Sequence, residues 1–318
     1  MCSFAPNCMN LFTKLLSFFH LGDRLKSLVD ERMKANSLMT LSDYLEFHYT
    51  QLAIHSVDSG VTSEKLVPNR QVIVSLTSHG NRIFDAYMTI ETIMQGTVKP
   101  NRIILWLPDD RKVSLSYLDN QVKRGLEIKY VKDLGPHTKL IPALREYPDD
   151  IIITIDDDIF YKPDMIETLL RTFKEDSQAI LANRIAVITT DKKGNVESYL
   201  KWVHYNYPSG TTKRNVIIGV EGCLYPPHSL SDEVFNEEAI NELCPTADDI
   251  WFTAMAMMKG TEIHHVDCRY EKGFAGGIAN QRMQRSGLVH LNENPKECLN
   301  DIQIQAVFDK YNLYPLIG

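Results

Sequence analysis

The sequence predicts an α/β protein, in which a mostly parallel central sheet is flanked by helices and preceded by a helical N-terminal extension. Residues 151–155 include four isoleucines, which is typical of a strand buried on both faces of a parallel sheet. Strand-like and helix-like segments alternate from residue 71 onward, as expected for parallel strands joined by crossover helices. The length of 318 residues suits one such domain with an extension.

The chain is expected to divide into a helical N-terminal extension with its linker, residues 1–68, and an α/β domain, residues 69–318. Residues 9–27 begin with an apolar stretch that Lys14 and His20 interrupt, and it is too short to span a membrane. This segment could lie on a membrane surface as an amphipathic helix or pack on its own domain, and the pattern leaves both open.

The elements of the α/β domain follow from their apolar patterns. The four leading strands should be residues 71–77, 102–107, 126–131 and 151–155. A helix with a one-sided apolar stripe should begin at Arg82. The remaining elements should be a short helix within 133–144, a helix ending at Phe173, a strand over 179–188, an irregular polar segment over 191–215, and a helix from an N-cap at Thr246 to Lys259.

Three consecutive carboxylates, Asp156, Asp157 and Asp158, follow the isoleucine strand. Side chains alternate along a strand, so Asp156 and Asp158 should point to one side and Asp157 to the other. Two hard oxygen ligands at the carboxyl end of a buried strand suit Mg²⁺ or Mn²⁺. The alternative is a polar loop in which aspartates gather without a ligand.

A second acidic pair, Asp248 and Asp249, should lie in the first turn of the helix that ends at Lys259. Carboxylates at this position are stabilised by the helix dipole whatever their function. Neighbouring residues on a helix point about 100° apart, so only one of the two can face a common substrate.

Composition excludes several classes of function. The net charge is −7, so the chain has no overall basic character for binding nucleic acid. The six cysteines form no CxxC pair, which argues against a zinc site and favours reduced thiols in a cytoplasmic protein. No secretory signal pattern is evident at the N-terminus. We therefore expect a cytoplasmic location, with residues 9–27 as a candidate contact to the inner face of the cytoplasmic membrane.

The order of these features resembles nucleotide-sugar glycosyltransferases of the GT-A fold, particularly bacterial family 2-like enzymes of surface-polysaccharide synthesis. The resemblance extends from about residue 70 to about residue 312. The segments that carry it are residues 74–78 with Arg82, 103–107, Asp133 with 139–142, 153–158, 219–227, 246–252 and 300–303.

The resemblance implies transfer of a sugar from a nucleotide-diphosphate sugar, with a UDP-sugar as the first expectation. The acceptor would be a hydroxyl of a glycan or lipid-linked glycan, in the synthesis of capsule, lipopolysaccharide or another surface polysaccharide. It also implies Mn²⁺ or Mg²⁺ as cofactor and, with a single carboxylate as base, inversion at the sugar.

The resemblance also assigns roles to residues. Asp158 would bind the metal directly, Asp156 would contact the metal or the ribose, and Asp157 would support the turn. His290 is the candidate for a third metal ligand. The donor-binding candidates are Thr77, Ser78, Arg82, Asp133, Lys139, Asp156 and Asp157. For Arg82 and Lys139 the alternative is a solvated surface charge.

The second acidic pair would supply the catalytic base, with Asp249 as the first candidate and Asp248 as the next. Gly222 and Tyr225 would contact the acceptor, Gly222 by letting the backbone approach and Tyr225 as a stacking surface. Trp251, in contrast, is expected in the core.

Three other functions compete with this interpretation. A phosphatase of the haloacid-dehalogenase type also uses a strand ending in Asp-x-Asp, but its acidic strand normally comes first in the chain, and here three strands precede it. A nucleotidyltransferase needs a glycine-rich, basic loop after the first strand, and residues 78–81 contain one glycine. The non-enzymatic alternative is a degenerate transferase acting as a binding subunit.

Overall fold

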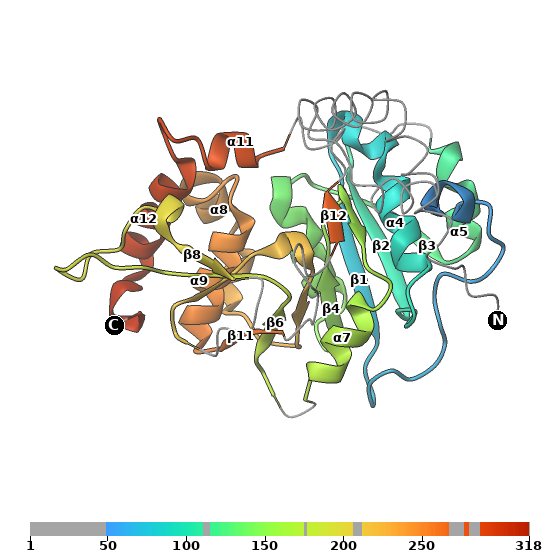
Figure 1. Cartoon of the computed structure of the whole chain (residues 1–318), viewed down its shortest axis with the longest axis horizontal. Coiled ribbons are helices and arrows are strands. Elements are labelled where there is room, and N and C mark those ends of the chain that lie inside the picture. The colour runs from blue at the N-terminus through green and yellow to red at the C-terminus, as the bar shows by residue number, and fades with distance from the viewer. Residues whose placement is uncertain are drawn as a thin grey trace, which may run out of the picture. The chain divides into compact units, whose positions relative to one another are not determined.

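The computed structural model describes residues 49–110, 115–174, 177–205, 212–266, 277–279 and 287–317. These residues form a mixed seven-stranded sheet with helices on both faces (Figure 1). No helix among them is long and apolar enough to cross a membrane. The amphipathic segment expected at residues 9–27 lies outside the described residues.

The central sheet confirms the predicted mostly parallel arrangement. β1, β2, β3 and β4 run parallel, β10 alone is antiparallel to its neighbours, and β6 and β11 are parallel to each other. The strands, in spatial order, are β11 (Ile263–His265), β6 (Ile180–Ala182), β10 (Cys223–Tyr225), β4 (Ile151–Thr154), β1 (Val72–Thr77), β2 (Arg102–Pro108) and β3 (Leu126–Val131). The four leading strands therefore lie close to where the sequence predicts them.

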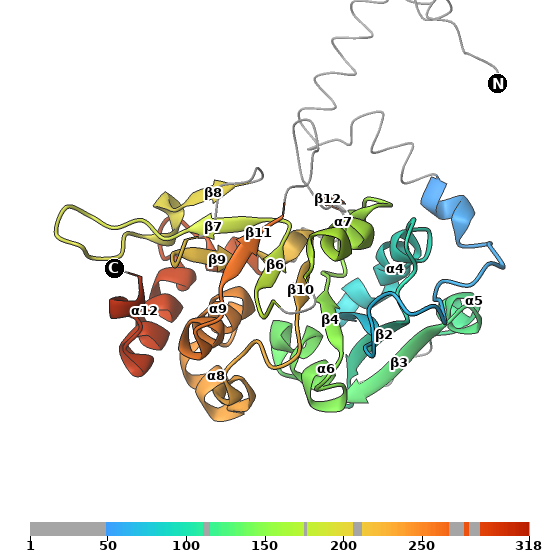
Figure 2. The same cartoon turned by 90° about the horizontal axis from the view of Figure 1, so that it is seen from below.

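Side chains of the central strands alternate between two hydrophobic clusters, one on each face of the sheet. Ile73, Ile104 and Ile152 belong to one cluster, and their neighbours along the strands belong to the other. One face is covered by α4 (Ala86–Met94) and α7 (Met165–Thr172). The opposite face, seen in Figure 2, is covered by α6 (Ile141–Glu146), α8 (Glu237–Leu243), α9 (Asp248–Lys259) and α12 (Leu299–Tyr311).

The strand predicted over residues 179–188 is two strands in different sheets. β6 belongs to the central sheet, whereas β7 (Ile185–Val187) lies between β8 (Val203–Tyr205) and β9 (Asn215–Ile217) in a three-stranded sheet. Asn183 separates them, because its backbone N–H and side-chain amide bind the carbonyls of Gly222 and Glu221. A polar residue engaged in this way ends the ladder, which an apolar pattern does not reveal.

The carboxyl ends of the parallel strands meet at one edge of the sheet. Thr77, near the end of β1, pairs with Trp106 of β2, and Thr154 of β4 pairs with Ser75. η1 (Gly80–Phe84) follows β1 at this edge, and η3 (Gly135–Lys139) follows β3. The acidic residues after β4 are therefore placed beside the loops that carry Arg82 and Lys139.

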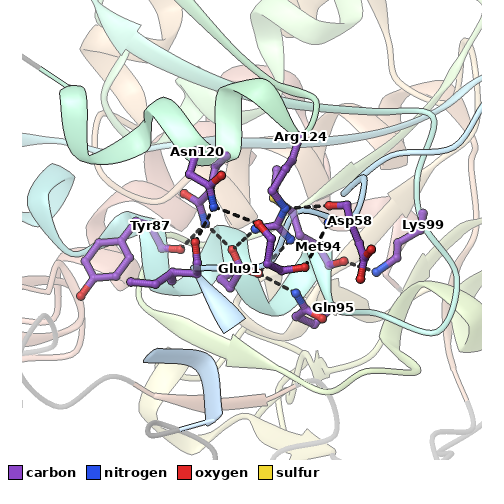
Figure 3. Close-up of polar contacts among 11 residues, drawn as sticks. Asp58, Tyr87, Glu91, Met94, Gln95, Lys99, Asn120 and Arg124 are labelled. Carbon is purple, nitrogen blue, oxygen red and sulfur yellow. Dashed lines mark hydrogen bonds and ion pairs between the residues drawn. The ribbon is translucent and has the colours of Figure 1, made fainter. Parts of the chain in front are cut away.

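A separate buried ion pair joins α4 to α5 (Asp119–Lys123). Glu91 and Arg124 are almost fully buried and form two parallel bonds of 2.9 and 3.0 Å (Figure 3). Arg124 also donates to the carbonyl of Asp58, and its own carbonyl accepts from Gly60. The pair therefore holds part of the segment that the sequence predicts to be a linker, while the domain boundary itself stays a prediction.

The remaining helical elements are short or lie toward the C-terminus. They are η2 (Ser116–Leu118), η4 (Tyr199–Lys201), η5 (Gly219–Glu221), η6 (Asp232–Phe235), α11 (Val289–Asn292) and η7 (Tyr314–Leu316). A two-stranded ladder pairs β5 (Ile159–Tyr161) with β12 (Gly277–Ala279). β5 begins immediately after the three aspartates, so it fixes the far end of the acidic segment.

Candidate active site

The three aspartates form a turn, not the end of a strand. β4 ends at Thr154 and β5 begins at Ile159. The expectation that alternation separates Asp157 from Asp156 and Asp158 is therefore wrong, because strand geometry stops before the first aspartate. Asp157 and Asp158 instead share one cation, and Asp156 has another.

Arg82 binds the second half of this acidic turn. Its guanidinium forms an ion pair with Asp157, and its Nη2 lies 2.9 Å from Asp158 Oδ2. Asp157 is buried and also accepts from the Ser78 hydroxyl at 2.5 Å, and its carbonyl accepts from Thr89. These contacts agree with the expected supporting role of Asp157. Arg82 is thus paired inside the protein and is not a solvated surface charge.

Lys139 joins the acidic turn to the start of α9. Its Nζ lies 2.6 Å from Asp156 Oδ1 and 2.9 Å from Asp248 Oδ2, and the residue is only 6% exposed. Burial disfavours its charge, yet Asp156, Asp248 and Asp249 together raise the pKa of Lys139 well above its usual value. Lys139 therefore stays charged and connects two segments that are far apart in the sequence.

The second acidic pair lies in the first turn of α9, as predicted, but the cap differs. The N-cap is Ala247, so the prediction of Thr246 is wrong. The Thr246 hydroxyl instead bonds to the side chains of Asn292 and Gln303, which ties the start of α9 to α11 and α12. A side chain with two such partners is not available to cap the helix.

Asp249 points toward the loop of residues 219–222, called the glycine loop below. Its Oδ2 accepts from the backbone N–H of Gly219 at 2.9 Å, and its Oδ1 is buried without a hydrogen-bond partner among the described residues. Burial, with the negative charge of Asp248, raises the pKa of Asp249 to about 8. A carboxyl group with one held oxygen, one unbonded oxygen and a raised pKa has the properties of a general base.

The loop of residues 219–222 requires its glycines. A Cβ on Gly219 would lie 2.7 Å from Asp249 Oδ1 and 3.2 Å from Lys139 Nζ. Gly222 has a φ of +96°, a conformation that other residues rarely adopt. Tyr225, however, is 1% exposed and packs edge-on against Phe252. The prediction of Tyr225 as a stacking surface for the acceptor is therefore wrong, because neither face of its ring is open.

The other predicted residues have partners or surroundings outside the ion pairs of Arg82 and Lys139. Thr77 donates its hydroxyl to the Trp106 carbonyl, and Asp133 accepts from the N–H of Gly135. His290 is exposed on α11 and is not brought together with Asp156 and Asp158, since no three acidic, histidine or cysteine side chains gather as a metal site among the described residues. Trp251 is fully buried, as predicted.

The charge balance leaves room for a divalent cation. Of the five aspartates in the acidic turn and at the start of α9, four form ion pairs with only two cations, Arg82 and Lys139, and the fifth, Asp249, accepts from the Gly219 N–H. Burial raises the pKa of Asp158 to about 7 despite the nearby guanidinium. Asp156 is the more open ligand, with a side chain 28% exposed. Mg²⁺ and Mn²⁺ commonly take one or two carboxylates and complete their shell with substrate phosphates, which fits this donor set.

Tyr161 is a residue of the site that sequence reasoning did not single out. Its hydroxyl accepts from the backbone N–H of Asp156 and donates to the carbonyl of Val220. The available signal was its position at the end of the short apolar run that follows the acidic turn. Nothing in that pattern, however, indicates which distant segment the hydroxyl reaches.

Comparison with known proteins gives a family for the central part of the chain. Residues 100–239 match the model described as "Glycosyl transferase family 2". A search of curated proteins gave no match. The predicted resemblance to family 2 glycosyltransferases of the GT-A fold is therefore confirmed over the matched residues.

Solved structures with similar folds share little sequence with this chain. PcManGT, a mannosyltransferase from Pyrobaculum calidifontis solved with GDP-Man and Mn²⁺, has 12% identity and a TM-score of 0.39, over 70% of this chain and 62% of that one. S. aureus TarS 1–349 has 13% identity and a TM-score of 0.44, over 76% of this chain and 71% of that one. This chain thus spans less than two thirds of the mannosyltransferase structure.

Proposed function

Because residues 100–239 belong to glycosyl transferase family 2, we propose that the protein transfers a sugar from a nucleotide-diphosphate sugar to an acceptor hydroxyl. The donor would be a UDP-sugar and the acceptor a glycan or lipid-linked glycan, in the synthesis of a surface polysaccharide. The observation that carries the proposal is the Lys139 bridge, which brings the acidic turn and the start of α9 into one site. A donor-binding turn and a candidate base are thereby adjacent.

The donor would bind at the acidic turn. Asp156 and Asp158 would hold Mn²⁺ or Mg²⁺, and the ion would neutralise the diphosphate as negative charge develops on the leaving group. Arg82 fixes Asp157 and Asp158, so it keeps the turn in one conformation. Lys139 forms ion pairs with Asp156 on one side and Asp248 on the other, so it holds the two carboxylates in a fixed orientation.

The acceptor would be activated by Asp249. The Gly219 N–H holds Oδ2, so Oδ1 is the atom that would take the proton from the attacking hydroxyl. With Asp249 as the single catalytic carboxylate, the acceptor would displace the nucleotide directly, and the sugar would be transferred with inversion. Asp248, held by Lys139, would orient the helix start and would take no proton itself.

A thermal-shift screen tests the donor class. We expect one member of a panel of UDP-, GDP-, dTDP- and CMP-sugars to stabilise the protein only when Mn²⁺ or Mg²⁺ is present. A ligand at 100 times its dissociation constant adds about 2.7 kcal/mol to the free energy of unfolding. Absence of metal-dependent stabilisation by every sugar nucleotide would contradict the proposal. Release of phosphate from simple esters would favour the phosphatase instead.

A further inference from the structure

Tyr161 contacts both the acidic turn and the glycine loop. It is the last residue of β5 and is 4% exposed. Its hydroxyl oxygen accepts from the Asp156 N–H at 2.9 Å and donates to the Val220 carbonyl at 2.8 Å. A phenolic hydroxyl can donate one bond and accept others, so both roles are satisfied by backbone groups of two separate loops.

The second of these loops continues directly to the candidate base. Val220 follows Gly219, whose N–H holds Asp249 Oδ2 at 2.9 Å. The turn is closed by a bond of 3.0 Å from the Gly222 N–H to the Gly219 carbonyl, so its residues are held together. A continuous path therefore runs from the Asp156 backbone through the Tyr161 hydroxyl and this turn to Asp249.

We infer that Tyr161 is a positioning residue that couples the donor-binding turn to the loop holding Asp249. This inference rests on the proposed function, because it takes the acidic turn as the donor site. Movement of the Asp156 backbone on donor binding would be transmitted through the hydroxyl to Val220 and thus to the Gly219 N–H. The base would then be set in place when the donor is bound.

A second connection between the same segments uses side chains. Lys139 joins Asp156 to Asp248 at the start of α9. It acts on the aspartate beside the candidate base, whereas Tyr161 acts on the loop that holds Asp249 itself. The two connections can be separated, because removal of the Tyr161 hydroxyl leaves the Lys139 ion pairs in place.

The variant Tyr161→Phe tests the coupling, because it keeps the buried ring and removes the hydroxyl. Hydrogen exchange would be followed by mass spectrometry in residues 155–161 and in residues 218–224. It would be measured with Mn²⁺ present, without nucleotide and with each nucleotide of the donor panel, UDP, GDP, dTDP and CMP. Tyr311→Phe is the matched control, since its hydroxyl also donates one bond, at 2.7 Å, but to Glu233 and not to a loop of the site.

In the wild type, the nucleotide should slow exchange in residues 155–161 and change it in residues 218–224. In Tyr161→Phe the response of residues 155–161 should persist, while the response of residues 218–224 should fall about tenfold, the usual worth of one lost buried hydrogen bond. Tyr311→Phe should behave as the wild type. A purely structural hydroxyl would change the exchange rates without nucleotide but not the response to it.

Two outcomes would overturn the coupling alone: an unchanged loop response in Tyr161→Phe, or a wild-type protein that responds at residues 155–161 and not at residues 218–224. The second outcome needs no variant, so the inference stays open to test if Tyr161→Phe does not fold. Absence of any wild-type response at residues 155–161 to all four nucleotides would overturn the proposed function and this inference with it.

Discussion

At the scale of single residues, buried ionisable groups determine how the site responds to pH. His137 is fully buried beside Phe252, and its Nδ1 lies 3.1 Å from the Leu134 carbonyl. Burial lowers the pKa of His137 to about 4. The ring is therefore neutral in the folded protein, two residues before the lysine that joins the acidic turn to α9.

His137 should make the folded state less stable in acid. The unfolded chain takes up a proton on this ring below about pH 6.5, whereas the folded protein does not until about pH 4. The stability of the folded state is therefore intact above pH 6.5 and is lost as the pH falls toward 4. We expect His137 to lower the free energy of unfolding by about 2 kcal/mol when the pH falls from 7 to 5.

Urea titrations of the wild type and of His137→Gln across this pH range measure the effect. The glutamine amide can still donate to the Leu134 carbonyl but cannot be protonated in this range. The difference in unfolding free energy between the two proteins should change by about 2 kcal/mol from pH 7 to pH 5. If the free energies of unfolding of the two proteins changed with pH in parallel, the His137 ring would take up its proton equally in the folded and unfolded states.

The sequence allowed some residues of the site to be selected, whereas others were misassigned or missed. Asp249, Asp248, Lys139 and the aspartates of the turn could be selected, because their segments follow one another in the order that the family resemblance implies, although each segment alone has a structural explanation. Tyr225 was misassigned because an aromatic residue in a glycine loop looks the same whether its ring faces solvent or the core. The partners of Tyr161 depend on tertiary contacts that no local pattern encodes.

At the scale of elements, the order of strands and helices was predictable and their ends were less so. β3 matches its predicted range, and β4 ends one residue early, at Thr154. That single residue matters, because it places the aspartates in a turn where strand alternation no longer applies. The break between β6 and β7 was missed because the polar residues Asn183 and Arg184 were taken as part of a single strand over 179–188.

The buried pair between α4 and α5 should be a major stabilising contact. Arg124→Met would remove the cation that pairs with Glu91 at a position that is 0% exposed. We expect the free energy of unfolding to fall by about 3–5 kcal/mol. The double variant Glu91→Leu with Arg124→Met should recover much of that loss, because no unpaired charge remains.

Chemical denaturation measures both variants, with Lys201→Met as the control. Lys201 and Glu197 form an exposed ion pair four residues apart, and breaking it should cost less than about 1 kcal/mol. A loss of similar size in Lys201→Met and Arg124→Met would mean that the buried pair contributes no more than a surface contact.

At the scale of the whole molecule, both the α/β class and the family could be predicted from the sequence. Alternating strands and helices predict the class, and the shared order of several weak motifs predicts the family now matched over residues 100–239. The direction of β10 was not predictable, because an antiparallel strand inside a parallel sheet has the same apolar pattern as its neighbours. Donor sugar, acceptor and linkage depend on side-chain shape in the site, which local sequence patterns do not encode.

Deletion of residues 1–38 distinguishes the two alternatives for the amphipathic segment, contact with a membrane surface and packing on the α/β domain. For contact with a membrane surface, we expect the truncated protein to remain folded and to keep metal-dependent donor binding, while losing affinity for vesicles that contain anionic lipid. Sedimentation with vesicles and the thermal-shift screen measure the two properties. An unfolded product would instead show that the segment packs on the α/β domain.

The most direct test of the account is the turnover of Asp249→Asn measured together with its affinity for the donor. Asparagine keeps the shape of the side chain and removes its basicity. We expect donor affinity within a few-fold of the wild type and a loss of kcat of about 10²–10⁴, the usual effect of removing a general base. Asp248→Asn should lose less.

The pH profile of kcat/KM in the same experiment tests whether Asp249 is the catalytic base. Since the pKa of Asp249 is raised to about 8, kcat/KM of the wild type should increase with pH as the carboxyl loses its proton through that range, and Asp249→Asn should lack this increase. If Asp249→Asn turned over normally and Asp248→Asn did not, the base would be its neighbour. Normal turnover of both variants would contradict the proposed mechanism.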